Sequence, residues 1–322
     1  MITSRSAFIR TALHATVSAF VATVSLPLLT GCDAPAPESA SSPAAAGGTG
    51  ASPAAGGSAP MTAGGNVSIE GSDTLLPLSQ KWVEAFGKKN PNAKMTVTGG
   101  GSGQGITALI NGTAAIANAS RAAEDKEKDA AKAKGFEMVE TAVARDGITI
   151  VVHPSNTVQS LTLEQLKGIY TGKINNWKEI GGPDTKIIAS GRDTASGTYK
   201  YFQEDVLKKE KYRPDMLTTP SNNKIADNVS KQKGGIGYIG VAYATEFVQA
   251  GKVKEVPVAF KQGDAPVLPT SENILSGKYP ISRALFNYTK GQPEGVVKEY
   301  LDFVTGPEGQ EIVKKEGYIT LK

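Results

Sequence analysis

The chain has 322 residues, of which 39% are hydrophobic, 20% charged and 7% aromatic. This apolar content can supply one large folded domain or two ordinary ones, and it excludes a wholly disordered protein. No internal apolar run approaches the roughly 20 residues of a membrane-spanning helix, which excludes a polytopic membrane protein. A single cysteine excludes a disulfide framework and a thiolate zinc site. Of the two histidines, His14 lies in the segment that we expect below to be removed, so His153 alone cannot form a multi-histidine metal site.

The first 31 residues have the pattern of a secretory signal. Arg5 and Arg10 form a basic start, and a mostly apolar stretch over residues 12–29 follows it. The stretch ends in Leu-Thr-Gly directly before Cys32, which resembles the cleavage box of bacterial lipoproteins. On that resemblance residues 1–31 are a lipoprotein signal peptide and Cys32 becomes the lipidated first residue, which anchors the chain to a membrane. The alternative is a membrane anchor that is not removed.

Residues 32–65 are almost entirely Ala, Gly, Pro, Ser and Thr, so we expect a disordered tether. Removal of residues 1–31 takes away two arginines and no acidic residue, and the formal net charge falls from +4 to +2. A nearly neutral mature chain argues against nucleic acid as a partner.

Short strand patterns alternate with helical patterns from residue 66 onward. In chain order we predict strand 67–69, a helix with Leu78, Trp82 and Phe86 on one face, strand 95–98, a helix with Ile106, Leu109 and Ile110, strand 148–152, helix 163–170, strand 186–189, helix 199–207, strand 235–240, and helices 296–304 and 307–315. The continuous apolar run 148–152 is typical of a parallel sheet. This alternation predicts an α/β fold with mixed, mainly parallel sheets and helices on both faces. The mixed-charge run 124–134 predicts one solvated helix face.

Four segments rich in glycine and hydroxyl residues each follow a predicted strand, and three of them begin a helix. They are residues 71–74, 99–105, 118–121 and 191–198. A helix start presents unpaired N–H groups and partial positive charge, and Ser and Thr hydroxyls add donors. In open α/β sheets such turns face the ligand crevice. Arg121 and Arg192 can add forked bonds to a tetrahedral oxyanion, so the segments together predict an anion site.

Each of these features has a simpler interpretation when it is taken alone. A Ser or Thr before a helix is most often only an N-cap, a glycine-rich loop is often only a turn, and an exposed arginine is usually a solvated surface group. The coincidence of four such turns, two of them with arginines, favours the anion site.

Several motifs resemble the phosphate-binding protein of bacterial ABC phosphate importers. They are Gly71-Ser-Asp-Thr-Leu-Leu-Pro-Leu, the loop Gly99 to Ile106, Ala119-Ser120-Arg121, the Arg-x-x-x-Ser-Gly-Thr element from Arg192 to Thr198, Gly234-Gly-Ile-Gly-Tyr238 and Pro307-Glu-Gly-Gln310. The resemblance implies a two-lobed periplasmic binding protein of type II, with lobe I at 66–144 plus 256–322 and lobe II at 145–255. It further implies a monomer that captures inorganic phosphate by hinge closure and delivers it to an ABC permease, in the periplasm or at the cell surface, without cofactor or metal.

The resemblance also implies the phosphate contacts. They are Asp73, Thr74, Leu75, Ser102, Ser120, Arg121, Arg192, Ser196, Gly197 and Thr198. Ser120 departs from the pattern, because some members carry there a carboxylate that accepts the phosphate proton. A carboxylate can accept a bond from P–OH but repels a fully ionised anion, so we hypothesise that Asp73 takes this role. The alternative is that Asp73 only caps its helix.

Three other functions compete with phosphate transport. The same fold can bind another oxyanion such as sulfate, molybdate or tungstate, and it can serve sensing rather than transport. A secreted phosphatase-like hydrolase needs a base or metal beside Ser102 or Ser196, and Gln104 interrupts the Gly-x-Ser-x-Gly pattern around Ser102. His153 ends an apolar strand and is better interpreted as a surface residue than as a base. We therefore expect no enzyme and no catalytic residues.

Overall fold

The structure is a computed structural model, and the residues that it describes are 66–321. The predicted signal peptide 1–31, the tether 32–65 and Cys32 lie outside the described residues. The strands are β1 Val67–Gly71, β2 Met95–Thr98, β3 Ile116–Ala119, β4 Met138–Val152, β5 Leu161–Thr162, β6 Ile188–Arg192, β7 Leu217–Thr219, β8 Gly235–Gly240, β9 Lys254–Val256, β10 Val258–Ala259 and β11 Ser282–Lys290. The helices are α1 Leu76–Lys89, α2 Ser102–Asn111, α3 Asp125–Ala133, α4 Leu163–Thr171, α5 Gly197–Asp205, α6 Asn222–Lys231, α7 Val241–Gln249, α8 Ser271–Leu275, α9 Gly295–Thr305 and α10 Pro307–Lys315, with a short 3₁₀ helix at Trp177–Ile180.

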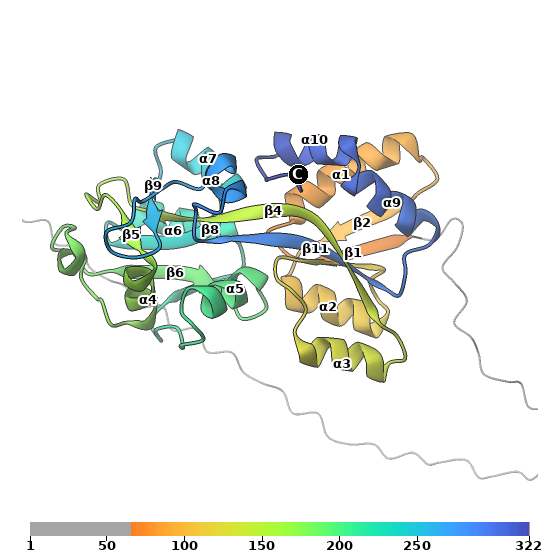
Figure 1. Ribbon diagram of the computed structural model, residues 1–322, viewed down its shortest axis with the longest axis horizontal. Helices are drawn as coiled ribbons and strands as arrows, with labels where there is room; N and C mark the ends of the chain where they lie inside the picture. The colour runs from red at the N-terminus through yellow and green to blue at the C-terminus, as the bar shows by residue number, and fades with distance from the viewer. Residues whose placement is uncertain (1–65, 322) are drawn as a thin grey trace, which may run out of the picture. The chain divides into compact units, whose positions relative to one another are not determined.

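Two groups of parallel strands are joined by two antiparallel strands. The sheet order is β2-β1-β3-β11-β4-β8-β6-β7, with β9 also paired to β4, and β10 pairs separately with β5. β1 is parallel to β2 and β3, and β6 is parallel to β7 and β8. β4 and β11 run antiparallel to each other and pass from one group to the other (Figure 1). The predicted α/β fold with mixed sheets is therefore confirmed.

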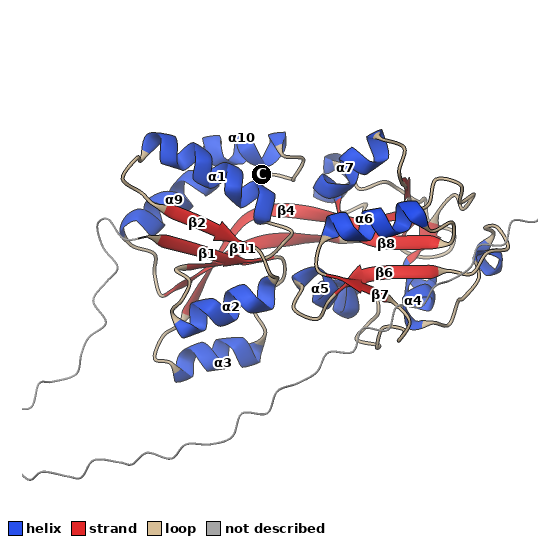
Figure 2. Cartoon of the chain, turned by 180° about the vertical axis from the view of Figure 1, so that it is seen from behind, coloured by secondary structure: helices blue, strands red, loops and turns tan. Residues whose placement is uncertain are grey.

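Helices cover both faces of each group of strands (Figure 2). We call the part with β1–β3, α1–α3, α9 and α10 lobe I, and the part with β5–β10 and α4–α8 lobe II. In lobe I, Trp82 and Phe86 of α1 pack with Tyr300 of α9 on one face, while α2 forms a separate core on the other. In lobe II, α4 and α5 pack on one face of the strands, and α6 and α7 pack on the other. Each lobe thus has its own buried core.

The prediction that strand 148–152 lies in a parallel sheet is wrong. The segment ends β4, whose partners β8, β9 and β11 are all antiparallel to it. Ile150 packs in the core beneath α4 and α5, whereas Val151 packs against α6 and α7. The run is continuously apolar because helices bury both of its faces, which can happen in either kind of sheet.

The segment after residue 256 packs with lobe II before the chain returns to lobe I. Val256, Val258, Tyr279 and Ile281 all pack in the core with Ile150 and Tyr170, and Leu285 is the first later residue in the core of lobe I. β9 and β10 hold this segment in lobe II by pairing with β4 and β5. At two or three residues each, these strands are too short to produce a recognisable sequence pattern.

Candidate functional site

Hydroxyl groups from four distant segments meet where the two lobes face each other. Thr74 Oγ1 lies 3.0 Å from Thr198 Oγ1, and Ser102 Oγ lies 3.3 Å from Ser120 Oγ. The backbone N–H of Ser120 also donates to Ser102 Oγ at 3.0 Å. All four side chains are buried. We call these residues the hydroxyl cluster.

The local sequence places each hydroxyl of the cluster at the end of a strand or the start of a helix. Thr74 follows β1 and precedes α1, Ser102 begins α2, Ser120 follows β3, and Thr198 lies in the first turn of α5. The starts of α2 and α5 are adjacent, because the N–H of Gly103 donates to Ala195 O at 3.1 Å (Figure 2). Two helix N-termini from different lobes therefore point their unpaired N–H groups and partial positive charge toward one buried region.

Arg192 enters the same region from the end of β6. Its side chain is buried, and Nη2 donates to Pro220 O at 2.7 Å while Nη1 forms an ion pair with Asp73 Oδ2 at 3.1 Å. The ion pair lacks hydrogen-bond geometry, so within residues 66–321 Nε and Nη1 have no hydrogen-bond partner. A buried guanidinium with unused donors is suited to bind an anion, since unpaired buried donors are costly.

Asp73 connects lobe I to lobe II rather than capping α1. Its Oδ2 accepts from both the backbone N (3.3 Å) and Nδ2 (3.0 Å) of Asn222, and it faces Arg192. The N-cap residue of α1 is Leu75, and no side chain caps that helix. Tyr243 Oη of α7 donates to the backbone oxygen of Asp73. The simpler interpretation of Asp73 as a helix cap is therefore wrong.

A second buried arginine, which the sequence analysis missed, contacts the hydroxyl cluster. Arg283 of β11 donates from Nη2 to Thr198 Oγ1 at 2.9 Å, to Thr74 Oγ1 at 3.2 Å and to Asp146 Oδ2 at 3.0 Å. Burial raises the pKa of Asp146, and the attraction of Arg283 opposes that rise. In the sequence, the only signal for the Arg283–Asp146 pair was a charged residue within each of the mostly apolar strands β4 and β11.

The remaining predicted contacts are Ser196, Gly197 and Leu75, and each has different neighbours. Ser196 Oγ caps α5 by accepting from the N–H groups of Thr198 (3.1 Å) and Tyr199 (3.4 Å), and its own proton is left to donate. Gly197 begins α5 beside Ser102 and Ser120. The N–H of Leu75 donates to Ser72 O at 3.1 Å.

Arg121 is held by acidic residues of lobe I instead of the hydroxyl cluster. It forms a forked pair with Glu127 at 2.8 and 2.6 Å, and Nη1 also donates to Ala122 O. With its charge and most of its donors engaged at the start of α3, Arg121 is not part of the site that we propose below.

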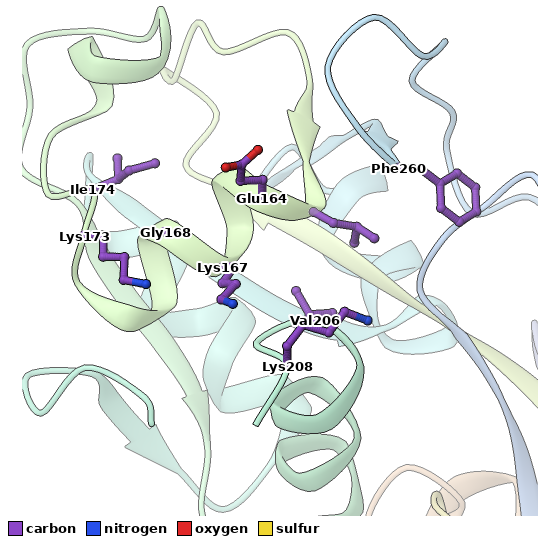
Figure 3. Close-up of a pocket in the computed structure, with 9 residues that line it drawn as sticks. Glu164, Lys167, Gly168, Lys173, Ile174, Val206, Lys208 and Phe260 are labelled. Carbon is purple, nitrogen blue, oxygen red and sulfur yellow. The ribbon is translucent and has the colours of Figure 1, made fainter. Parts of the chain in front are cut away.

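A separate pocket of about 600 Å³ lies in lobe II between α4 and the end of α5 (Figure 3). Apolar side chains and three lysines line it, but none of the predicted site residues does. Lys167 and Lys173 both pair with Glu210, at 2.7 and 2.8 Å, which neutralises much of the local charge. This pocket is therefore a weaker anion site than the hydroxyl cluster.

Possible metal ligands and His153 were the remaining chemistry-bearing groups of the described part of the chain. Residues 66–321 contain no group of three or more His, Cys, Asp or Glu side chains that could hold a metal ion. His153 pairs with Ser155 next to it, where Nδ1 lies 2.8 Å from Oγ. Over the same residues, no helix combines the length and the apolar character needed to cross a membrane.

Two α/β lobes joined by two strands, with buried donors from both lobes meeting between them, define a two-lobed solute-binding protein. Comparison with known proteins agrees: residues 45–308 match the model of the PBP superfamily domain. Phosphate-binding protein PstS of Pseudomonas aeruginosa is 34% identical over 80% of this chain and 83% of its own length, and PstS of Bacillus subtilis is 35% identical over 80% and 81%. The chain belongs to this superfamily, and its family is that of the PstS proteins.

Solved structures of phosphate-binding transport proteins also resemble this chain. A phosphate ABC transporter substrate-binding protein with bound phosphate, from Clostridium perfringens, is 35% identical with a TM-score of 0.72, over 80% of this chain and 100% of the other. An ABC-type phosphate transport receptor from Vibrio cholerae is 29% identical with a TM-score of 0.64, over 79% and 99%.

Proposed function

We propose that the chain is an extracytoplasmic receptor that captures inorganic phosphate between its lobes and delivers it to an ABC permease. The observation that carries the proposal is the meeting of Thr74, Ser102, Ser120, Thr198 and Arg192 from both lobes in one buried region. These groups are hydrogen-bond donors of the kind that bind tetrahedral oxygens, and the names of the relatives support phosphate as the ligand.

The mechanism that we propose is hinge closure. An anion held by the donors of one lobe gains the donors of the other only when the lobes close, so phosphate shifts the open–closed equilibrium toward the closed form. β4 and β11 connect the lobes and are the elements that must bend. We place the boundaries of lobe II near residues 145 and 282, where the buried side chains change from one core to the other.

Binding rather than catalysis is the role that the serines support. Ser102 Oγ contacts Ser120, and Ser196 Oγ caps α5, so neither hydroxyl has a histidine or carboxylate as its hydrogen-bond partner among the described residues. Incubation with a chromogenic phosphate ester checks this, and hydrolysis that requires Ser102 would contradict it.

Calorimetric titration of the purified chain with phosphate, arsenate, sulfate and molybdate tests the ligand. Calorimetry is preferable to tryptophan fluorescence, because Trp82 and Trp177 are fully buried and bond to Gly309 and Gly234, away from the hydroxyl cluster. We expect tight binding of phosphate and weak binding of sulfate. No heat with phosphate, or equal affinity for sulfate, would overturn the proposal.

Asp73→Asn tests whether Asp73 accepts the phosphate proton. Asn keeps only one acceptor oxygen, which Asn222 occupies, and its NH2 replaces the oxygen that could accept from P–OH. The substitution also removes the charge that repels a fully ionised anion, so we expect the phosphate-over-sulfate ratio to fall about tenfold or more. Asn retains the size of the side chain and can still accept from Asn222. An unchanged ratio would show that Asp73 serves only to hold Arg192 and Asn222.

We further propose that residues 1–31 direct export, that Cys32 is lipidated, and that residues 32–65 tether a monomeric receptor to the membrane. The Leu-Thr-Gly-Cys box supports this. In cells fed with labelled palmitate, Cys32→Ser is expected to abolish incorporation of the label and to release the protein from the membrane fraction. Label retained by this serine variant would contradict lipidation at Cys32.

A further inference from the structure

Arg283 is the one residue of the joining strand β11 whose side chain bonds to both lobes at the hydroxyl cluster, within residues 66–321. Nη2 reaches Thr74 of lobe I and Thr198 of lobe II, at 3.2 and 2.9 Å. The side chain is 2% exposed, and its Nη1 has no hydrogen-bond partner among the described residues. The ring of Tyr201 covers the guanidinium, with Cζ 5.5 Å from the ring centre. An arginine so enclosed has few states available to it, so its donors have fixed directions.

The hydrogen-bond chemistry of this contact constrains the two threonines. A guanidinium only donates, so both threonine oxygens act as acceptors toward Arg283, whose two Nη2 protons are shared among Thr74, Thr198 and Asp146. The two hydroxyls also share one bond, at 3.0 Å, which uses one of their two protons. One hydroxyl proton remains, and the oxygen that carries it already accepts from Arg283. That hydroxyl is therefore set to donate to a ligand rather than to accept from one.

The charges around the hydroxyl cluster support the same conclusion. Arg283 pairs with Asp146 and Arg192 pairs with Asp73, at 3.0 and 3.1 Å. The two buried arginines are balanced by two carboxylates, so attraction of an anion depends on how the donors are aimed more than on net charge. Orientation of hydroxyl protons by a fixed cation is then an effective way to favour a ligand that accepts hydrogen bonds.

We propose that Arg283 is a positioning residue for anion recognition: by donating to both Thr74 and Thr198, it leaves the one free hydroxyl proton of this pair set to donate to the anion when the lobes close. This role rests on the proposed function, because the ligand that it serves is phosphate. Its effect passes through the threonines, whereas an arginine that only neutralises Asp146 would act without them. The two roles therefore predict different results for a double substitution. Only the positioning role makes the effect of an Arg283 substitution on phosphate affinity depend on the Thr198 hydroxyl.

The test is a double-mutant cycle in phosphate affinity, measured by calorimetry on the full chain. Arg283→Lys keeps a positive charge beside Asp146 but loses the planar guanidinium that holds Asp146 through Nε and Nη2 while Nη2 reaches both threonines, and we expect phosphate affinity to fall about tenfold. In the Thr198→Val background the same substitution is expected to change affinity less than threefold. Arg213→Lys is the matched control, because Arg213 is also buried and forms a forked pair with Asp215, but it contacts no residue of the cluster. We expect no change in affinity for the control.

Each outcome bears on the role of Arg283. Wild-type affinity in Arg283→Lys, or an equal loss with and without the Thr198 hydroxyl, would overturn it while the proposed function stands. A wild-type chain that gives no heat with phosphate would overturn the proposed function and this role together. If Arg283→Lys fails to fold, the paired change Arg283→Met with Asp146→Asn removes both buried charges, and the same loss and the same dependence on Thr198 are expected.

Discussion

Gly197→Ala is expected to leave both lobes folded and to weaken phosphate binding about tenfold or more. Gly197 begins α5, and its φ lies outside the left-handed region, so alanine fits the local backbone. A Cβ at this position would lie 2.6 Å from Ser120 Oγ and closer still to Ser102 Oγ. Both atoms belong to lobe I, whereas Gly197 belongs to lobe II. The added methyl group therefore acts only when the lobes close.

The site has little freedom to accommodate that methyl group. Ser102 Oγ is fixed by the N–H of Ser120 at 3.0 Å, so a rotation away from the new Cβ would break this bond and remove a hydroxyl from the cluster. Incomplete closure would separate Thr74 from Thr198. Overpacking of this kind costs about 1–3 kcal/mol, which corresponds to about 5- to 150-fold in affinity.

Two measurements separate closure from stability. Calorimetry gives the phosphate affinity, and thermal unfolding without phosphate gives the stability, which we expect to be unchanged or slightly raised. Gly87→Ala is the matched control, since Gly87 lies within α1 and an added Cβ there would meet no atom within 4 Å. Wild-type affinity in Gly197→Ala would mean that the lobes bind phosphate in a more open arrangement.

Much of the site was predictable because its parts are local. Thr74, Ser102, Ser120 and Thr198 each stand beside a strand end or a helix start, and short sequence patterns reveal such positions. In an α/β sheet these positions gather at one edge, so their meeting follows from the fold class. The helices from Leu76, Ser102 and Gly197 were likewise predictable from apolar spacing and from the residues at their starts.

The residues that join the lobes were not predictable in the same way. β11 was missed because Arg283 and Asn287 occupy buried positions that an isolated strand pattern fills with apolar residues. Three of their partners, Asp146, Thr74 and Asn118, are more than a hundred residues away, and Thr198 is 85 residues away. Asn222, which binds Asp73 from the start of α6, has no local signal either. Single-sequence patterns describe elements, whereas these contacts depend on how two lobes meet.

Arg192→Met is expected to have the largest effect on phosphate binding of all the substitutions considered. Methionine has similar length but no charge and no donor, so the unpartnered Nε and Nη1 are lost. The change also leaves the carboxylate of Asp73 without its cation, and this carboxylate then repels an anion in a region of low dielectric constant. Loss of a buried arginine that donates hydrogen bonds to a charged ligand costs about 2–5 kcal/mol, or about 30-fold to several thousand-fold in affinity.

The double variant Arg192→Met with Asp73→Asn identifies how much of the loss is repulsion. If the bare carboxylate contributes, the second substitution restores part of the affinity, so that the double variant binds phosphate about tenfold more tightly than Arg192→Met alone. Arg192→Lys should fall between the wild type and the methionine variant, because lysine keeps the charge but donates from a single point. Calorimetry on the three variants gives these differences, and circular dichroism verifies that each is folded. Affinity within threefold of the wild type in Arg192→Met would remove Arg192 from the site, because a charged fork that contacts the anion cannot be lost at so small a cost.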